Sequence, residues 1–373
     1  MKNYQLRMHG IMLLIACLSM HLLFAQQPVR RACGTEIGYD SILAYGGAVR
    51  DRYEQLERFT QQYIQNLRQK EGEGFDGARA SSIIIPVVVH IVWHAAAENI
   101  PDARVFEQID RLNQDYQRLN ADAGSVPAEF AGVASNLQVR FQLAVRDPNC
   151  NPTTGITRTN TTATSFSNPT TAQATDINFN PVKSAAAGGV DAWPADRYLN
   201  IWVCRFTSST LLGYSSFPGF PANVDGVVIL YSAFGNTSGA FNLGRTATHE
   251  IGHYLNLFHT FQGGCAGTTA ATCGTSGDRV CDTPPVASSN GGCPSGTLNS
   301  CTETPTNQND QWMNYMDYTD DACMYMFSNG QKERVDACLY GARSALLSSD
   351  ALIPVASGAT ADLWVQARSV ACR

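Results

Sequence analysis

Residues 246–260 read TATHEIGHYLNLFHT, and this stretch decides the expected architecture of the chain. His249 and His253 are four residues apart, so on a helix both imidazoles project from one face and can bind a single zinc ion. Glu250 lies beside them, where a carboxylate can act on a metal-bound water molecule. His259 is too far along the chain to be a third ligand on an unbroken helix. The spacing therefore predicts that the helix ends soon after His253 and that the chain turns back, which leaves three ligands and one open position.

Asn256 lies at the expected turn, where zinc sites of this pattern usually have glycine. Asparagine is the non-glycine residue that best tolerates left-handed backbone angles and is accepted at helix C-termini. The turn is therefore feasible, and an open fourth position is typical of a catalytic rather than a structural zinc site. The alternative is that the three histidines only pack in the core. The motif would then have arisen by chance.

A second motif, NYMDY, lies at residues 314–318. A methionine beneath three histidines provides a soft apolar floor, as in a Met-turn, and Met316 is the candidate. The alternative is an ordinary core methionine. Tyr318 can donate its phenol to the oxyanion of a tetrahedral intermediate, and a partly buried packing tyrosine is the alternative.

Hydrophobic periodicity places these motifs in an α+β chain. Residues 83–94 form a β-branched run that is too continuous for a half-exposed strand, so they predict a central buried strand. Residues 151–175 are rich in Thr, Asn and Pro and predict a surface loop. The last helix is expected to open at Ser328, which forms a capping box with Gln331, and to run to residue 346. Further strands are predicted over 137–145, 199–203, 212–216 and 227–230, and further helices over 106–119 and 243–257.

Net charge and the position of apolar residues indicate where the protein acts and which classes of partner it can bind. The 373 residues carry a net charge of -6, which argues against a nucleic-acid partner. Residues 1–25 hold the only long apolar run, so no membrane span is expected in the mature chain. Their positive start and short apolar segment predict a secretory signal peptide. A lipoprotein signal ending at Cys17 is one alternative, and a transmembrane anchor, for which the segment is short, is another.

The chain has 12 cysteines, which indicate an oxidising compartment, a metal site or both. Removal of the signal peptide removes Cys17 and leaves an odd number, so one thiol needs a role. Six cysteines lie between Cys265 and Cys323 and predict a stapled, loop-rich region. Residues 26–80 show helical spacing and then a glycine-rich break, which predicts a pro-segment made of a short helix and a flexible linker. The expected maturation cleavage lies near Arg79.

These motifs resemble the pappalysin family of metzincin peptidases, including its cytophagalysin-like bacterial members. The likeness covers residues 83–347, and besides the zinc stretch and the Met-turn it includes residues 85–90, 155–157, 225–228, 282–284 and 330–331. It implies a zinc endopeptidase of the metzincin-type zincin fold. That fold would have a five-stranded twisted mixed sheet and an active-site helix in an upper subdomain, residues 81–259. Below it would lie an irregular, cysteine-rich subdomain with a C-terminal helix, residues 260–347, and a tail over 348–373.

Residues 30–35 resemble the cysteine switch of zymogens, so Cys33 is expected to bind the zinc as a thiolate and displace the catalytic water. The alternative is a disulfide with Cys372 or another partner. The family also implies structural calcium. Asp278, Asp282 and the carbonyl of Thr283 are the candidate ligands, and a solvated acidic turn is the alternative.

Family members that cleave before Arg or Lys tend to carry an acidic residue directly before the cysteine that follows the Met-turn. Here Ala322 precedes Cys323, so Asp320 or Asp321 could form the acidic wall of that specificity pocket instead, and the alternative is a neutral pocket that prefers apolar residues. Solvated turn residues or calcium ligands are the alternatives for both aspartates.

The sequence thus predicts a secreted zinc metalloendopeptidase that is made as a latent zymogen and works as a monomer. Peptide substrates are expected to lie extended along an edge strand at residues 213–216. One alternative is a catalytically silent binding module stabilised by zinc and calcium, and another is a zinc amidase or esterase of small molecules. His90 and His94 are expected to be packed or hydrogen-bonded rather than ligands.

Overall fold

The computed structural model describes residues 31–35, 47–72, 82–170, 173 and 175–355. The predicted signal peptide, the maturation site near Arg79 and the far end of the tail, including Cys372, lie outside these residues. Within the described ranges, no helix is long and apolar enough to cross a membrane.

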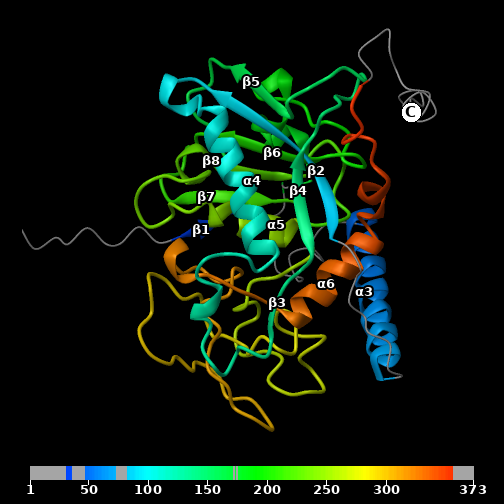
Figure 1. Cartoon of the computed structure of the whole chain (residues 1–373), viewed down its shortest axis with the longest axis vertical. Coiled ribbons are helices and arrows are strands. Elements are labelled where there is room, and N and C mark those ends of the chain that lie inside the picture. Colours follow the sequence, from blue (N-terminus) through cyan, green and yellow to red (C-terminus); the bar gives the residue numbers. More distant parts are fainter. Residues whose placement is uncertain (1–30, 36–46, 73–81, 171–172, 174, 356–373) are drawn as a thin grey trace, which may run out of the picture. The chain divides into compact units, whose positions relative to one another are not determined.

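A seven-stranded sheet forms the upper half, and β2 (Ile83–Trp93) lies inside it, one strand from the edge that β4 and β5 form (Figure 1). The strand order is β1-β7-β8-β6-β2-β4, and β5 also pairs with β2. The β7–β8 pair is antiparallel and the other pairs are parallel, so the sheet is mixed, as predicted. The other strands are β1 (Ala32–Cys33), β4 (Val139–Leu143), β5 (Ile156–Asn160), β6 (Leu199–Cys204), β7 (Leu211–Ser215) and β8 (Val227–Leu230).

The sheet contains the five predicted strands and two more. The prediction of a surface loop over 151–175 is wrong for β5, which pairs in parallel with β2 from Val89 to Trp93. The eleven residues of β2 are long enough to bind β4 along the first half and β5 along the second. The other additional strand, β1, comes from the predicted pro-segment.

The two faces of β2 are covered by different layers. Alternate residues from Ile85 to Ile91 pack in one cluster with α4 (Asp102–Tyr116) and α5 (Arg245–Tyr254). Val92 points to the other face and packs there against the segment that precedes β6 and against β6 itself. Burial on both faces explains why β2 is a continuous apolar run.

The histidines of β2 and of the turn after it are hydrogen-bonded inside the protein, as predicted. His90 lies between Thr157 and Asn200, and burial lowers its pKa to about 4. His94 contacts the carbonyl of Thr161 through Nδ1 at 3.0 Å. Neither histidine belongs to the metal-binding cluster that the described residues form.

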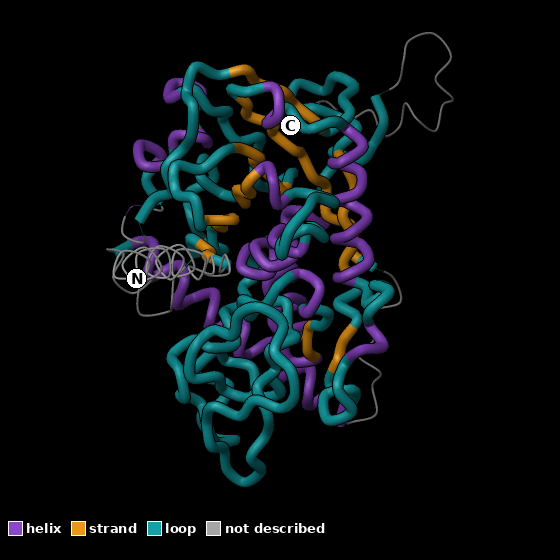
Figure 2. The backbone as a smooth tube through the Cα atoms, turned by 90° about the vertical axis from the view of Figure 1, so that its left-hand side faces the viewer, coloured by secondary structure: helices purple, strands orange, loops and turns teal. Residues whose placement is uncertain are grey.

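The lower half consists mainly of loops, as Figure 2 shows. Disulfides join Cys265 to Cys301, Cys273 to Cys281 and Cys293 to Cys323, so this region is stapled as predicted. A short ladder of β3 (Ala134–Ser135) and β9 (Phe327–Ser328) leads into α6 (Asn329–Tyr340). Ser328 and Gln331 form the predicted capping box of α6. The last helix ends earlier than expected, and a separate 3-10 turn follows it at Ser344–Ser348.

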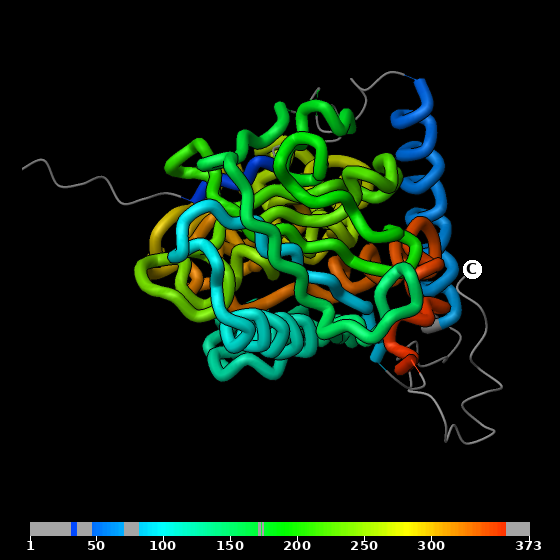
Figure 3. The backbone as a smooth tube through the Cα atoms, turned by 90° about the horizontal axis from the view of Figure 1, so that it is seen from above, coloured from blue at the N-terminus to red at the C-terminus, as the bar shows by residue number. Residues whose placement is uncertain are grey.

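The helix predicted in the pro-segment is α3 (Ala48–Gly72), which packs against α6 at one side of the molecule (Figures 1 and 3). Residues beyond the predicted start of the tail also pack on the sheet: Ala351 is buried, and its carbonyl accepts from the backbone of Val145. The remaining elements are short 3-10 turns at Ala96–Glu98, Ala123–Ser125, Ile177–Phe179, Pro181–Lys183, Ala185–Ala187, Tyr231–Ala233 and Asp321–Cys323.

Candidate metal centre

Three histidine side chains meet below the sheet at the C-terminal end of α5. The helix ends at Tyr254, and Asn256 adopts the predicted left-handed conformation with φ of 72°. The chain therefore turns back, and His259 comes to lie beside His249 and His253. The three Nε2 atoms are 3.0–3.3 Å from one another. Tetrahedral zinc with Zn–N bonds of about 2.0–2.1 Å needs nitrogen separations close to these.

The protonation of the imidazoles also suits a metal ion. The carbonyls of Tyr315 and Leu257 lie 2.7 and 2.8 Å from Nδ1 of His249 and His253, so each Nδ1 carries a proton and donates it. Burial lowers the pKa of His253 to about 4 and holds that of the other two histidines well below their usual range. The Nε2 lone pairs then face one another at about 3 Å, an arrangement that a cation stabilises. The donor set therefore fits zinc.

Glu250 lies between the histidines and β7, the strand that becomes the edge of the sheet if β1 leaves. It is buried, and burial raises its pKa to about 7 against the opposing effects of Cys33, Thr35 and Arg31. A Cβ atom at Gly213 of β7 would lie 2.8 Å from Cγ of Glu250, so only glycine permits this approach. The side chain of Glu250 is thus held against β7 beside the three histidines.

Cys33 reaches the centre from β1, which pairs in parallel with β7. Its Sγ atom and the three histidine nitrogens lie within 4.8 Å of one another, and Sγ is 3.3 Å from Oε2 of Glu250. Thr35 donates to the same oxygen at 3.0 Å and accepts from the backbone of Ser215 at 2.7 Å. Burial and Glu250 raise the pKa of the Cys33 thiol well above its usual range. Residues 33–35 therefore contact the histidine cluster, Glu250 and β7 at the same time.

The alternative of a disulfide at Cys33 is wrong, because its thiol is free. Cys33 is not the single unpaired thiol that the odd cysteine count predicted, because Cys204 and Cys338 are free and buried as well. A cysteine in a core behaves as a small hydrophobic residue. An odd number of cysteines therefore does not show which thiol has a function. The position of Cys33 is the stronger observation.

Met316, the methionine of the predicted Met-turn, packs directly against α5 at Gly252. Sδ of Met316 would be 2.3 Å from a Cβ atom at residue 252, so Gly252 makes room for the sulfur between the two α5 histidines. Tyr318 lies beside the cluster, and its ring centroid is 5.0 Å from that of His259 and 5.7 Å from that of His249.

The buried carboxylate of Asp115 fixes α5 to α4 and to the Met-turn. It accepts from Thr248 at 2.8 Å, from the hydroxyl of Tyr315 at 2.9 Å and from Arg245 at 3.4 Å. Burial raises the pKa of Asp115 to about 6, against the lowering effect of Arg245. This network positions the helix that carries two of the histidines.

The two candidate specificity residues have different surroundings. Asp321 is fully buried, and its Oδ1 accepts from Arg31 at 2.5 Å. Its Oδ2 accepts from the backbone N–H groups of Leu243 and Arg245. Asp320 is partly exposed and donates its own N–H to Gly292. Arg31 and Thr35 were not singled out from the sequence, although both flank Cys33 in the segment that was.

The predicted calcium ligands make internal hydrogen bonds. Asp278 accepts from Val280 at 3.0 Å and from the hydroxyl of Thr283 at 2.5 Å. Asp282 accepts from Ser328 and from the N–H of Gly330. Among the described residues, these carboxylates do not join a third acidic, histidine or cysteine group in a potential metal cluster.

Comparison with known proteins identifies relatives of this chain. The peptidase M43 family model, described as pregnancy-associated plasma protein-A, matches residues 186–340. An extracellular metalloprotease of Verticillium alfalfae is 34% identical over 279 residues, which span 73% of this chain and 84% of the relative.

Two solved structures from Tannerella forsythia are also similar. Mature mirolysin in complex with a cleaved peptide is 40% identical with a TM-score of 0.65, and the match covers 75% of this chain and 100% of that one. A mutant of promirolysin is 36% identical with a TM-score of 0.71, and the match covers 88% of this chain and 100% of that one. The precursor thus matches a larger part of this chain than the mature form does.

Proposed function

Because the chain belongs to the pappalysin family of metallopeptidases, we propose that His249, His253 and His259 hold a catalytic zinc ion in a secreted endopeptidase. The observation that carries the proposal is the convergence of three Nε2 atoms at 3.0–3.3 Å beside a buried carboxylate. The relatives named above are metalloproteases, so neither a catalytically silent binding module nor a small-molecule amidase or esterase has comparable support.

The residues of the site suggest how each step is assisted. Bound zinc supplies a Lewis acid for the scissile carbonyl and the attacking water. Glu250 accepts a proton from that water and delivers it to the leaving amine. The substrate lies extended on β7, where backbone groups pair as they do with β1 in the precursor. Tyr318, beside two of the histidines, donates its hydroxyl to the oxyanion.

Metal removal tests this function directly. Treatment of the matured enzyme with a zinc-selective chelator is expected to abolish cleavage of an unstructured protein, because the three histidines alone provide no Lewis acid. Addition of one equivalent of zinc should restore it, as measured by peptide release. Calcium added alone is the control and should restore nothing. Full activity of metal-free protein, verified by elemental analysis, would contradict the proposal.

A zymogen form is supported by the solved precursor relative and by the position of β1. We infer that residues 26–80 are the pro-segment and that Cys33 binds the zinc as a thiolate, since a cation at the histidines favours thiolate over thiol. Thr35 would add to latency by holding both Glu250 and the backbone of β7. Cleavage near Arg79 would then release the segment.

Asp321 is the better candidate for an acidic wall that binds Arg or Lys of the substrate. In the precursor its Oδ1 is paired with Arg31, a basic side chain presented two residues before the switch cysteine. Departure of Arg31 would leave a buried carboxylate oxygen without its cation, which is unfavourable until another basic side chain enters. Arg31 therefore mimics the substrate residue that the pocket prefers.

Asp321→Asn is expected to lower the preference for Arg or Lys at least about tenfold, because it removes the charge but keeps an acceptor for the two backbone N–H groups. The measurement is kcat/KM for matched peptides with Arg or Leu after the scissile bond. Asp320→Asn is the matched control and should change the ratio little. A ratio unchanged in Asp321→Asn and lowered in Asp320→Asn would transfer the role to Asp320.

Calcium binding, the route of secretion and the oligomeric state are proposed from the sequence and the family resemblance. Asp278, Asp282 and the carbonyl of Thr283 are still the proposed calcium ligands, supported by family resemblance rather than by a converging oxygen cluster. The extracellular relatives support secretion, while the choice between a cleaved signal peptide and a lipid anchor at Cys17 is proposed from the sequence alone. A monomer without a nucleic-acid partner is likewise a prediction from the sequence.

A further inference from the structure

Helix α3 covers an apolar surface that reaches the metal centre. Tyr53 and Leu56 of α3 pack in one buried cluster with three phenylalanines and a valine. One of these, Phe217, has its ring centroid 5.5 Å from that of His253. The hydroxyl of Tyr53 lies 3.2 Å from Oδ1 of Asn256, the residue at the turn between the zinc ligands. The binding surface of α3 is therefore continuous with the site.

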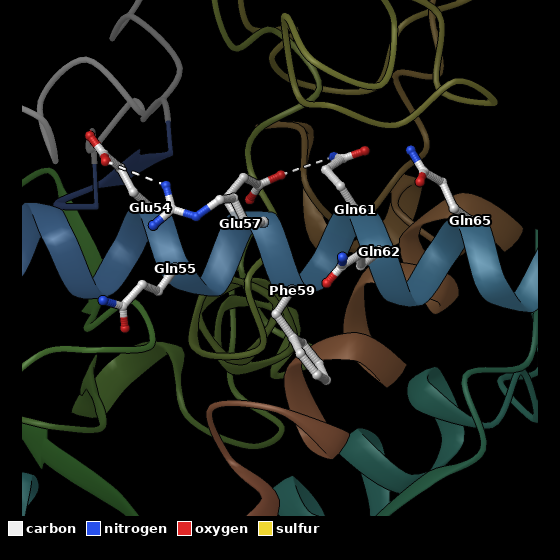
Figure 4. Close-up of a pocket in the computed structure, with 8 residues that line it drawn as sticks. Glu54, Gln55, Glu57, Phe59, Gln61, Gln62 and Gln65 are labelled. Carbon is white, nitrogen blue, oxygen red and sulfur yellow. Dashed lines mark hydrogen bonds and ion pairs between the residues drawn. The ribbon is translucent and has the colours of Figure 1, made fainter.

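A buried ion pair lies in the middle of this contact. Glu57 of α3 accepts from both terminal nitrogens of Arg334, at 2.9 and 3.1 Å, and Arg279 adds a second guanidinium at 3.3 Å. Burial opposes ionisation of Glu57, but the two arginines outweigh it and lower its pKa to about 2. Glu57 projects from the same side of α3 as Gln61, which donates to it, while Phe59 projects from the other side (Figure 4).

Removal of α3 would expose this surface, which could then bind another ligand. Arg334 donates to the carbonyl of Asn256 as well as to Glu57. Arg334 is fully buried with α3 in place, so removal of α3 would leave its guanidinium and that of Arg279 beside an apolar surface without the carboxylate of Glu57, and a ligand that brings a carboxylate would restore the ion pair. We call this surface the α3 footprint, and its residues are Phe217, Phe220, Val224, Phe258, Arg279 and Arg334.

We propose that in the matured enzyme the α3 footprint is an exosite that binds an acidic amphipathic helix of a protein substrate while another segment of that substrate lies in the cleft. The complementary helix carries a carboxylate directly after a leucine and one turn after an aromatic residue, as Tyr53, Leu56 and Glu57 do. This inference rests on the proposed function, because the footprint opens only if maturation removes residues 26–80. It predicts that folded or partly helical proteins are better substrates than short peptides of the same cleavage sequence.

The test compares two substrates of the matured enzyme. One is a short cleavable peptide, and the other is the same peptide joined by a glycine-serine linker of about 20 residues to residues 48–72. The enzyme is purified away from its released pro-segment, and mass spectrometry verifies that residues 48–72 are absent. Linkage is expected to lower KM at least about tenfold with little change in kcat, because binding at the footprint raises the local concentration of the peptide.

Two variants identify the contact. Glu57→Gln in the linked substrate should remove most of the gain, because it removes the charge that pairs with both Arg334 and Arg279. Arg279→Gln in the enzyme should reduce the gain while cleavage of the unlinked peptide stays unchanged. Equal KM values for linked and unlinked peptides would overturn the exosite, whereas failure to cleave the unlinked peptide would instead overturn the proposed function. A gain that survives both variants would also reject the footprint as the binding site.

Discussion

Glu250→Ala is expected to lower kcat by roughly 10²–10⁴-fold, the usual contribution of a general acid–base group. The three histidine ligands remain, so metal content should stay at one zinc per chain. The fold should also survive, because burial raises the pKa of Glu250 to about 7 and its ionised form is not what stabilises the protein. The measurement is turnover of an unstructured protein by the variant after processing by a separate protease that is then removed.

Glu250→Gln provides the stricter form of this test, because it keeps the shape of the side chain beside Gly213 and cannot take a proton. Asp110→Ala, on the exposed face of α4, is the matched control and should behave as the unmodified enzyme. Near-normal turnover by Glu250→Gln with zinc bound would show that another group is the base.

Cys33→Ala in the full precursor is expected to raise activity before any cleavage by at least about tenfold, which corresponds to about 1.4 kcal/mol of lost pro-segment binding. The variant removes the sulfur that lies within 4.8 Å of the histidine nitrogens but keeps β1 and the contact of Arg31 with Asp321. Initial rates on a short peptide, measured before the pro-segment is lost, give the size of the effect. Loss of the pro-segment should also be faster.

Cys204→Ala is the matched control for the thiol, since Cys204 is also free and buried but lies in β6. It should leave latency intact. A Cys33→Ala precursor that stays as silent as the unmodified one would reject the thiol as the switch and assign latency to the rest of the segment. Thr35→Val would then be the next variant, because Thr35 holds both Glu250 and β7.

The metal centre could be predicted from the sequence because its geometry depends on residues that are close together in the chain. The spacing of His249, Glu250 and His253 is a property of one helix, and the left-handed angle of Asn256 follows from its own side-chain type. The five central strands were predicted for the same reason, since each has its own apolar pattern. Strand β5 was missed because its residues, ITRTN, present no apolar face, and its pairing depends on the length of β2.

The contacts of the pro-segment could not be predicted, because they join residues far apart in sequence. Arg31 and Asp321 are separated by 290 positions, and Glu57 and Arg334 by 277. No periodicity connects such pairs, and a charged residue in a sequence usually marks a solvated surface. Only the three-dimensional arrangement shows that these four side chains are buried.

The pairing of β1 with β7 also affects how the precursor behaves before it is activated. An open edge strand offers unpaired N–H and C=O groups to any neighbouring chain and promotes aggregation. In the precursor that edge is already occupied by Ala32 and Cys33, and Gly34 donates to the carbonyl of Gly213 at 2.8 Å. The segment therefore covers the hydrogen-bonding edge of β7 for as long as it stays paired. If maturation removes residues 26–80, it uncovers an edge that is only five residues long, and so short an edge limits pairing between mature molecules.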